Sequence, residues 1–408
     1  MKIHIAIVTD QQLANLLPLL ADVPDKLLLL VSDKMLKKAQ AFLKIVKKQP
    51  SLANVSITQE HGLPDSSIKD IQEFGLNILG KLEGEDQQVV FNLAGGTKLM
   101  ALALSQVFNE PHFTQIYPNT EHDRIETLWP IGRPSLPLTT LLNTKQHIEA
   151  HSVTWRSADS ESLDWLEKLQ GRVNLTKLLA SQLATDTENT QNLIGQINYA
   201  GANAQDKNKT VTHPQQQLKY VNKRMYKLLE AYNQHELIDW DSNNHKDITF
   251  RSKDALRYAT GGWLEEYFYI VAQQCELEDC QSGIKITDDF DRKADLRNEL
   301  DGAIAYNNRL MLAECKTSTL GKNAQKDSDI IYKLDSIAHH IGGLYCTRIL
   351  LSAITLNHTT KQNRDVEITK RAKAAGITVL DGANITHLES LIKYWQQHGN
   401  ITDFLPGA

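Results

Sequence analysis

Apolar and polar positions alternate in short blocks over the first third of the chain. Residues 3–9, 27–32 and 88–93 are nearly continuous apolar runs, which is typical of buried strands. The segments between them carry apolar residues at helical spacing, as residues 35–46 do. This repeated strand–helix–strand order predicts an α/β domain with a mainly parallel, doubly wound sheet over residues 1–145.

The pattern becomes polar and helical over residues 146–254, where strand signals fade. Helical spacing covers residues 163–183 and 215–233. Two short segments at 236–240 and 247–251 predict a small hairpin or wing. We expect a linker domain there, with a winged-helix-like fold as one interpretation.

Strands return over residues 255–408. A predicted helix at 262–274 precedes two strands at 300–306 and 309–317, and Asn307-Asn308 between them is a good tight-turn pair. A strand–helix–strand–helix succession follows at residues 345–354, 364–375, 377–380 and 384–398. The pattern therefore predicts a C-terminal α/β domain.

Composition narrows the class of protein. The chain has 408 residues, of which 41% are hydrophobic and 23% charged, so a wholly disordered chain is excluded. No apolar run is long enough for a transmembrane helix or a secretory signal, and the four cysteines form no C-x-x-C pair. We therefore expect a cytoplasmic protein without zinc or disulfides. The net charge of −5 excludes a protein that coats nucleic acid but allows local basic patches.

A glycine-rich turn follows the predicted strand at 88–93. Gly95 and Gly96 let backbone amides approach a ligand, and the next helix begins with free N–H groups and the positive end of its dipole. Thr97 and Lys98 add a hydroxyl and a positive charge, so the turn suits a phosphate. Polar residues at neighbouring strand ends would face the same crevice: Thr9, Asp10, Asn15, Ser32 and Asn92. The alternative is that the two glycines form only a tight strand-to-helix turn.

The turn lacks the spacing of a Walker A loop and of G-x-G-x-x-G, which weakens an ATP or nicotinamide interpretation. Thr9-Asp10, Asn15 and Pro18, together with Asn92 and the Gly-Gly-Thr-Lys turn, resemble a CARF domain, the CRISPR-associated Rossmann fold. The resemblance implies a homodimer that binds a cyclic oligoadenylate across its cleft. Cyclic tetra-adenylate is the ligand that we expect. A two-fold symmetric ligand would suit two copies of the site.

A second group of candidate residues lies on the paired strands of the C-terminal domain. Glu314 and Lys316 are two residues apart on a strand and so point to one face, whereas Cys315 points away. Pairing through Asn307-Asn308 would bring Asp301 to them. Two carboxylates can hold Mg²⁺ or Mn²⁺, and the lysine can stabilise charge, as in the D…E-x-K core of PD-(D/E)xK nucleases. The alternative is a surface charge pair.

A glutamate pair opens the helix upstream. We expect Glu265 to be a third metal ligand, with Glu266 as the alternative. The other interpretation is that both glutamates lie on a solvent-exposed face of the helix and bind no metal. Asp301-Gly302 and the Glu-Cys-Lys triplet resemble the restriction-endonuclease-like half of CARF–nuclease effectors of type III CRISPR systems. Three lysines after Lys316 line either a phosphate-binding groove or a solvated helix face: Lys322, Lys326 and Lys333.

Together the two resemblances imply a nuclease for antiviral defence that cyclic tetra-adenylate activates. They imply Asp301, Glu314 and Glu265 as metal ligands, Lys316 as a catalytic residue, and single-stranded or supercoiled DNA as substrate, with RNA as a further substrate class. Two rivals stay open from the residues alone. One is a constitutive repair or restriction nuclease, and the other is a ligand-responsive transcription regulator.

Overall fold

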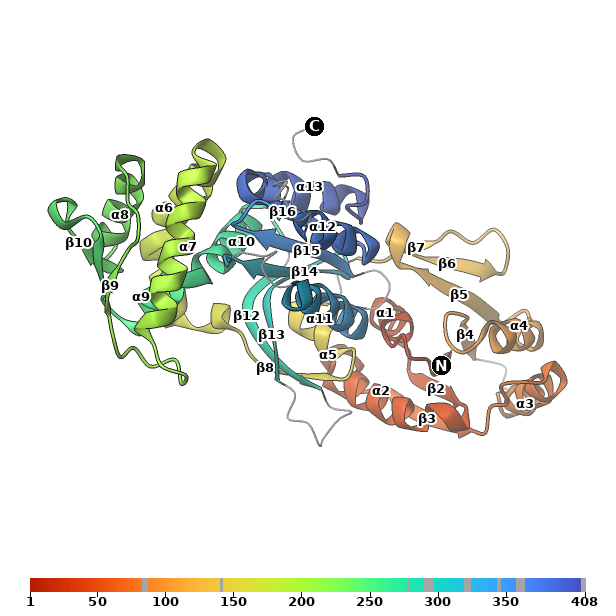
Figure 1. Cartoon of the computed structure of the whole chain (residues 1–408). Helices are drawn as coiled ribbons and strands as arrows, with labels where there is room; N and C mark the ends of the chain where they lie inside the picture. Colours follow the sequence, from red (N-terminus) through yellow and green to blue (C-terminus); the bar gives the residue numbers. More distant parts are fainter. Residues whose placement is uncertain are drawn as a thin grey trace.

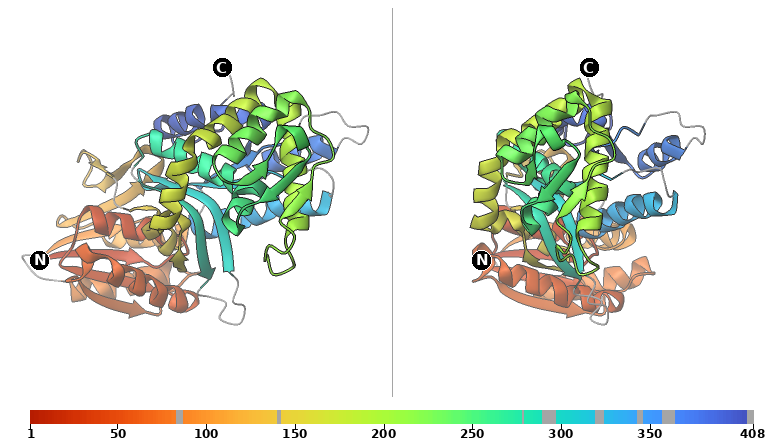
Figure 2. Two further views of the ribbon diagram at one scale, coloured as in Figure 1. Left: turned by 90° about the vertical axis from the view of Figure 1, so that its left-hand side faces the viewer. Right: turned by 60° about the vertical axis from the view of Figure 1, so that its left-hand side comes forward.

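The protein is described from a computed structural model that covers residues 1–82, 87–139, 142–277, 279–288, 297–318, 324–342, 346–356 and 364–404. Figure 1 shows the C-terminal sheet and its helices between the N-terminal sheet on one side and the helices of the middle segment on the other. In Figure 2, where the left-hand side of Figure 1 comes forward, the helices of the middle segment lie in front of the C-terminal sheet. The middle segment therefore connects the two sheets in sequence but does not separate them in space. No helix in the described ranges is both long enough and apolar enough to cross a membrane.

Seven of the described strands form the N-terminal sheet, in the order β3-β2-β1-β4-β5-β6-β7. Their bounds are β1 (Lys2–Ile7), β2 (Lys26–Val31), β3 (Ser56–His61), β4 (Gln88–Asn92), β5 (Phe113–Asn119), β6 (Arg124–Trp129) and β7 (Leu136–Pro137). Strands β1 to β5 pair in parallel, and β6 and β7 are antiparallel. The chain moves outward from β1 to β3 and returns across β1 to β4, so the strand order reverses between β1 and β4. The predicted parallel, doubly wound sheet is confirmed.

Helices cover both faces of this sheet: α1 (Leu13–Ala21), α2 (Leu36–Lys48), α3 (Ile68–Lys81) and α4 (Lys98–Val107). Strand β2 shows why, because alternate residues of a strand point to opposite faces. Leu27 and Leu29 pack with α1 and α2, whereas Leu28 and Leu30 pack with α3 and α4. A strand buried on both faces needs the continuous apolar run that the sequence shows.

The middle segment is mostly helical. Its elements are α5 (Thr144–Glu149), β8 (Val153–Ser157), α6 (Leu163–Thr185), α7 (Thr187–Ala204), β9 (Gln215–Gln217), α8 (Lys223–Gln234), β10 (Ile238–Trp240), β11 (Asp247–Phe250) and α9 (Lys253–Arg257). Strands β10 and β11 form the predicted hairpin, and β9 completes a small sheet in the order β10-β11-β9. Two local predictions differ from the structure: residues 215–217 are a strand, not the start of a helix, and β8 pairs with β12 of the C-terminal sheet.

The C-terminal sheet has the order β16-β15-β14-β13-β12-β8 within the described residues. Its remaining strands are β12 (Asp279–Asp288), β13 (Arg297–Tyr306), β14 (Arg309–Lys316), β15 (Thr347–Ser352) and β16 (Ile377–Asp381). The sheet is antiparallel from β8 to β14 and parallel from β14 to β16. Asn307 and Asn308 both have positive φ, 47° and 58°, and make the predicted tight turn between β13 and β14.

Helices also cover both faces of the C-terminal sheet. They are α10 (Trp263–Gln274), α11 (Ala324–Gly342), α12 (Arg364–Ala374) and α13 (Leu388–His398). Helix α10 packs between the sheet, α6 and α13, and α11 and α12 cover the other face. Gly302 of β13 allows the close approach of α10, because a Cβ there would lie 2.3 Å from the Phe268 ring. This contact brings the beginning of α10 next to Asp301.

Candidate active site and sensor site

The expected Asp–Glu–Lys group is assembled on β13 and β14. Gly302 pairs with Ala313, which puts Asp301 opposite Glu314 on the two strands. The Lys316 ammonium lies 2.6 Å from Glu314 Oε1 and 3.4 Å from Asp301 Oδ2. The Cys315 amide donates to Asp301 Oδ2 at 2.7 Å, so the backbone of β14 fixes that carboxylate. The pleat and the two-residue turn thus bring together three side chains that are up to 15 residues apart.

Burial and mutual charge set the protonation of this group. Burial raises the pKa of Glu314, and the Asp301 charge raises it further, while Lys316 and Lys333 oppose both effects. Burial acts to lower the pKa of Lys316, but the charges of Asp301 and Glu314 outweigh it and leave that pKa above its ordinary value. Lys316 therefore stays protonated and carries its positive charge into a largely desolvated site.

Glu265 faces the same site from the first turn of α10. Burial, followed by the charge of Asp301, raises the pKa of Glu265 to about 8. Arg257 Nη2 lies 3.5 Å from Glu265 Oε2 and acts in the opposite direction. This glutamate is therefore close enough to Asp301 for the Asp301 charge to disfavour its ionisation. That is the arrangement that a bound cation would relieve.

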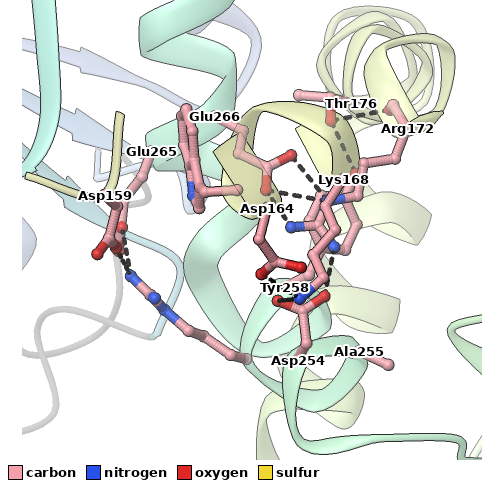
Figure 3. Close-up of polar contacts among 12 residues, drawn as sticks. Asp159, Asp164, Lys168, Arg172, Thr176, Asp254, Ala255, Tyr258, Glu265 and Glu266 are labelled. Atoms are coloured by element: carbon pink, nitrogen blue, oxygen red, sulfur yellow. Dashed lines mark hydrogen bonds and ion pairs between the residues drawn. The ribbon is translucent and has the colours of Figure 1, made fainter. Parts of the chain in front are cut away.

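Glu266 has a different environment. It is 2% exposed and accepts from Arg172 Nε at 2.9 and 3.0 Å through its two carboxylate oxygens. Arg172 also donates to Asp254 at 2.8 Å and lies over the Tyr258 ring. Figure 3 shows Glu266 turned toward Arg172 and Glu265 turned toward Asp159. Of the two glutamates that the sequence left open, only Glu265 is placed toward Asp301.

Two residues that the sequence analysis did not single out border the site. Asp159 lies in a 3₁₀ turn before α6, and it accepts from Arg257 Nη2 at 2.5 Å (Figure 3). Lys285 Nζ lies 3.7 Å from the same carboxylate. Asp159 fits against Gly283, where a Cβ would come within 2.4 Å of it. No local motif marks Asp159, and Arg257 lies in an ordinary charged segment, so the sequence gives no signal for either.

A π-helical turn, Tyr258–Gly262, connects α9 to α10 directly beside the site. The Thr317 hydroxyl donates to Thr260 O at 3.1 Å and ties the end of β14 to this turn. Gly261 lies close by, because a Cβ on it would come within 3.3 Å of that hydroxyl. Such turns often occur at functional sites, and here the turn aims the first residues of α10 toward β14.

The three carboxylates are the type of ligand that a hard divalent cation prefers, but their present spacing does not suit one. Asp301 and Glu314 both contact the Lys316 ammonium, and the Asp301 charge contributes to the raised pKa of Glu265. Oxygen ligands of this type suit Mg²⁺ or Mn²⁺. Among the residues that the structure describes, no three His, Cys, Asp or Glu side chains already lie within reach of one metal ion.

Of the lysines after Lys316, Lys333 acts on this site. Its charge lowers the pKa of Glu314, which places it on the same side of the sheet. Lys322 lies outside the described residues, and so does the side chain of Lys326.

The residues expected to bind a cyclic oligoadenylate, here called the sensor candidates, divide into buried and exposed groups. Asn15 and Asn92 are buried, and Asn92 Nδ2 donates to Asn15 Oδ1 at 3.0 Å and to Ala14 O at 2.8 Å. Asn15 in turn donates to Ile7 O at 2.7 Å, and Asn92 Oδ1 accepts from the Ala94 amide at 3.0 Å. These two amides join the loops after β1 and β4 across the point where the strand order reverses. They hold the loops in place and have little free capacity for a ligand.

The glycines of the turn have separate roles. Gly95 is buried, and a Cβ there would lie 2.0 Å from Ile7 O, so only glycine lets this loop lie against β1. Gly96 has a φ of +71°, which favours glycine. Thr97 caps α4 by accepting from the Met100 amide at 3.2 Å.

The exposed sensor candidates lie around the buried Asn15, Asn92 and Gly95. Gly96, Thr97, Lys98 and Asp10 are exposed and Thr9 is half-buried. Asp10 pairs with Lys38 at 3.0 Å. Ser32, at the end of β2, is buried. The carboxyl edge of the sheet thus presents backbone amides, a hydroxyl and an amine, as a phosphate site requires.

Family comparison identifies both ends of the chain. Residues 3–145 match the Card1 CARF domain, and residues 252–399 match the Card1-like endonuclease domain. The chain belongs to the Card1-like CARF endonucleases. It is accordingly an endonuclease, and the expected CARF domain is confirmed. Among curated proteins, none is significantly similar in sequence.

Solved structures show the same fold over the whole chain. The structure of Can2 from Sulfobacillus thermosulfidooxidans in complex with cyclic tetra-adenylate is 22% identical, with a TM-score of 0.74 over 97% of each chain. Protein VC1899 from Vibrio cholerae is 19% identical, with a TM-score of 0.80 over 98% of this chain and 99% of that one. A type III CRISPR defence DNA nuclease activated by cyclic oligoadenylate has a TM-score of 0.50 at 12% identity, over 86% of this chain and 45% of that one.

Proposed function

We propose that this CARF endonuclease is switched on by cyclic tetra-adenylate and then cuts DNA with a divalent metal, Mg²⁺ or Mn²⁺. The observation that carries the nuclease chemistry is the convergence of Asp301, Glu314 and Lys316, with Lys316 2.6 Å from one carboxylate and 3.4 Å from the other. This is the donor set that phosphodiester hydrolysis needs: carboxylates for a cation and one fixed positive charge.

The site residues have distinct roles in this proposal. Asp301, Glu314 and Glu265 would hold the metal, which supplies Lewis-acid stabilisation of the scissile phosphate. The Cys315 amide keeps Asp301 oriented, and the β-strand geometry keeps Glu314 beside it. Lys316 exchanges its contact with Glu314 for a phosphoryl oxygen and stabilises the charge that develops there. Arg257 and Lys285, both about half exposed, provide positive charge beside the carboxylates for the flanking phosphates.

The sensor half supports the choice of activator. Amides, Thr97 and Lys98 lie at the carboxyl ends of β1 and β4, where ligands of doubly wound sheets bind. Can2, which shares the fold, was solved with cyclic tetra-adenylate. We propose that Thr9, Asp10, Gly96, Thr97 and Lys98 contact the ligand, and that Asn15, Ser32, Asn92 and Gly95 shape the loops. A homodimer would place two such edges around one symmetric ring.

Substrate and cellular location belong to the same proposal. We favour single-stranded or supercoiled DNA, with RNA as the second substrate class, because the half-exposed cations that border the site, Arg257 and Lys285, attract phosphates and do not select particular bases. The four cysteines are buried free thiols, which fits action in the reducing cytoplasm.

A cleavage assay with and without activator tests the proposal. Wild-type protein with MnCl₂ is incubated with single-stranded DNA, supercoiled plasmid or RNA, with and without cyclic tetra-adenylate. We expect cleavage only when both metal and activator are present, and none for Glu314→Gln or Lys316→Met. Glu389→Gln, at a half-exposed glutamate of α13 paired with Lys393, is the control and should cut normally. Equal cutting with and without activator would favour a constitutive nuclease instead.

A further inference from the structure

The turn between β13 and β14 reaches out of the endonuclease domain and into the CARF domain. Asn308 Nδ2 donates to Thr139 O at 2.8 Å, and His147 Nε2 lies 3.2 Å from Asn308 O. These contacts join residues more than 150 positions apart. The same two strands carry Asp301, Glu314 and Lys316 toward their other ends.

Arg309, the first residue of β14, makes the strongest of these contacts. Its Nη2 donates to Asp123 Oδ2 at 2.7 Å and to Glu121 O at 3.1 Å, and its Nε donates to Thr120 O at 3.4 Å. All three partners lie in the connection between β5 and β6 of the CARF sheet. The Arg309 side chain is only 8% exposed, so this is a desolvated, charge-assisted contact.

A cavity lies between this turn and the sensor loops. It measures about 230 Å³ and is lined by Gln11 and Ala94 from the loops after β1 and β4, by Tyr117–Thr120 and by Asn308–Leu310. Gln11 follows Asp10, and Ala94 precedes Gly95. The loops that would hold the activator are therefore separated from the hairpin by one small cavity, and a movement of these loops alters the shape of the cavity directly.

The strand itself is suited to carry a displacement. β14 pairs with β13 on one side and with β15 on the other, so its backbone is fixed along its length. Glu314 is five residues from Arg309, which is roughly 17 Å along an extended strand. The covalent connection from sensor to nuclease runs through the middle segment, whose helices α6 to α9 lie on the far side of the C-terminal sheet (Figure 1).

We propose that Arg309 is a positioning residue of the endonuclease, through which the CARF domain sets the place of Glu314 and Lys316. The inference rests on the proposed activation by a cyclic oligoadenylate. Ligand binding moves the loops after β1 and β4 together with the adjoining β5–β6 connection. Arg309 follows that connection, and β14 shifts with it, so the carboxylates and Lys316 reach the spacing that metal and substrate need. Arg309 itself touches neither.

The experiment compares four variants of the full-length protein. Arg309→Gln removes the charge and most donors, Arg309→Lys keeps the charge, and Asp123→Asn removes the charge of the partner while tolerating its φ of 48°. Arg348→Gln is the matched control. Arg348 is an arginine of similar burial in the neighbouring strand β15, but its carboxylate partner, Asp335, lies within the endonuclease domain. Each variant is assayed for binding of cyclic tetra-adenylate, for thermal unfolding, and for Mn²⁺-dependent DNA cleavage with and without that activator.

We expect Arg309→Gln and Asp123→Asn to bind cyclic tetra-adenylate as wild type does, yet to lose about tenfold or more of the activation ratio, which is a typical size for coupling between sites. Arg309→Lys should restore part of the ratio, and Arg348→Gln should keep it. A wild-type ratio in Arg309→Gln overturns the inference, as does an equal loss in Arg348→Gln. A wild-type protein that shows no activation at all refutes the proposed function instead, and the inference with it.

Discussion

Glu265 and Glu266 are neighbours in the first turn of α10, yet Glu265 pairs with Arg257 within range of the Asp301 charge, whereas Glu266 is enclosed by Arg172. Successive residues of a helix point about 100° apart, so two identical side chains enter opposite environments. Glu265 carries a raised pKa and a weak, 3.5 Å contact with Arg257. Glu266 accepts from both Nε and Nη2 of Arg172 in a dry interior. We therefore propose a chemical role for Glu265 and a structural role for Glu266.

Replacing each glutamate by glutamine should give opposite phenotypes. Glu265→Gln should abolish metal-dependent DNA cleavage and leave the protein at least as stable as wild type, because it removes a metal ligand but no strong contact. Glu266→Gln leaves Arg172 without its buried counter-charge and should lower the free energy of unfolding by about 3 kcal/mol. Urea unfolding and cleavage at saturating Mn²⁺ check both variants. Cleavage by Glu265→Gln at the wild-type rate would contradict the assignment.

The stability of the metal-free protein should fall as the pH rises, because Glu265 ionises. Its pKa is raised to about 8 in the fold, mainly by burial and then by Asp301, so the folded state binds a proton that the unfolded state releases near pH 4.5. The stability linked to this proton is complete below pH 4.5 and is lost as the pH rises to about 8. Urea unfolding in EDTA should therefore show a stronger decline between pH 5 and 8 in wild type than in Glu265→Gln. Parallel curves would contradict the raised pKa.

The affinity for the metal should rise with pH, whereas the stability of the metal-free protein falls. A cation binds the ionised carboxylate and must displace the proton, so the apparent affinity for Mn²⁺ should rise until the pH passes about 8. Calorimetric titration of wild type with Mn²⁺ at several pH values measures this dependence. A flat profile would mean that Glu265 is not a ligand.

The contact between Gly302 and Phe268 should be essential for both folding and activity. Gly302→Ala would place a Cβ 2.3 Å from the Phe268 ring and push α10 away from β13, which should cost about 1–3 kcal/mol. Since Glu265 lies on α10 and Asp301 on β13, cleavage should also fall. Gly80→Ala is the control, because a Cβ at this exposed helical glycine meets nothing within 4 Å. It should be neutral or slightly stabilising in thermal unfolding.

Two sensor variants should separate loop support from ligand contact. Asn92→Ala removes the link to Asn15, Ala14 O and the Ala94 amide, so it should lower both stability and the affinity for cyclic tetra-adenylate. Lys98→Ala removes an exposed charge and should weaken ligand binding with little effect on unfolding. Equilibrium binding and thermal unfolding of the two variants test this. Equal stability losses would contradict the division of roles.

Much of the fold follows from local pattern. Strands buried on both faces need continuous apolar runs, which is why β1, β2 and β4 are visible in the sequence. The two asparagines between β13 and β14 accept positive φ, so the hairpin and the meeting of Asp301 with Glu314 and Lys316 follow from spacing alone. Strands β8 and β12 escaped detection because the pairing of β8 with a distant segment, not its own pattern, makes it part of the C-terminal sheet.

The sequence by itself determined which side chains are the candidates for the chemistry and on which strands they lie, because strand periodicity and turn geometry act over a few residues. Only the tertiary structure decided that Glu265 and not Glu266 faces Asp301, that Asp159 and Arg257 border the site, and that Arg309 joins the two domains. Each of these depends on which surfaces pack together across long stretches of chain. That outcome is set by the summed burial of many side chains, to which no local pattern gives access.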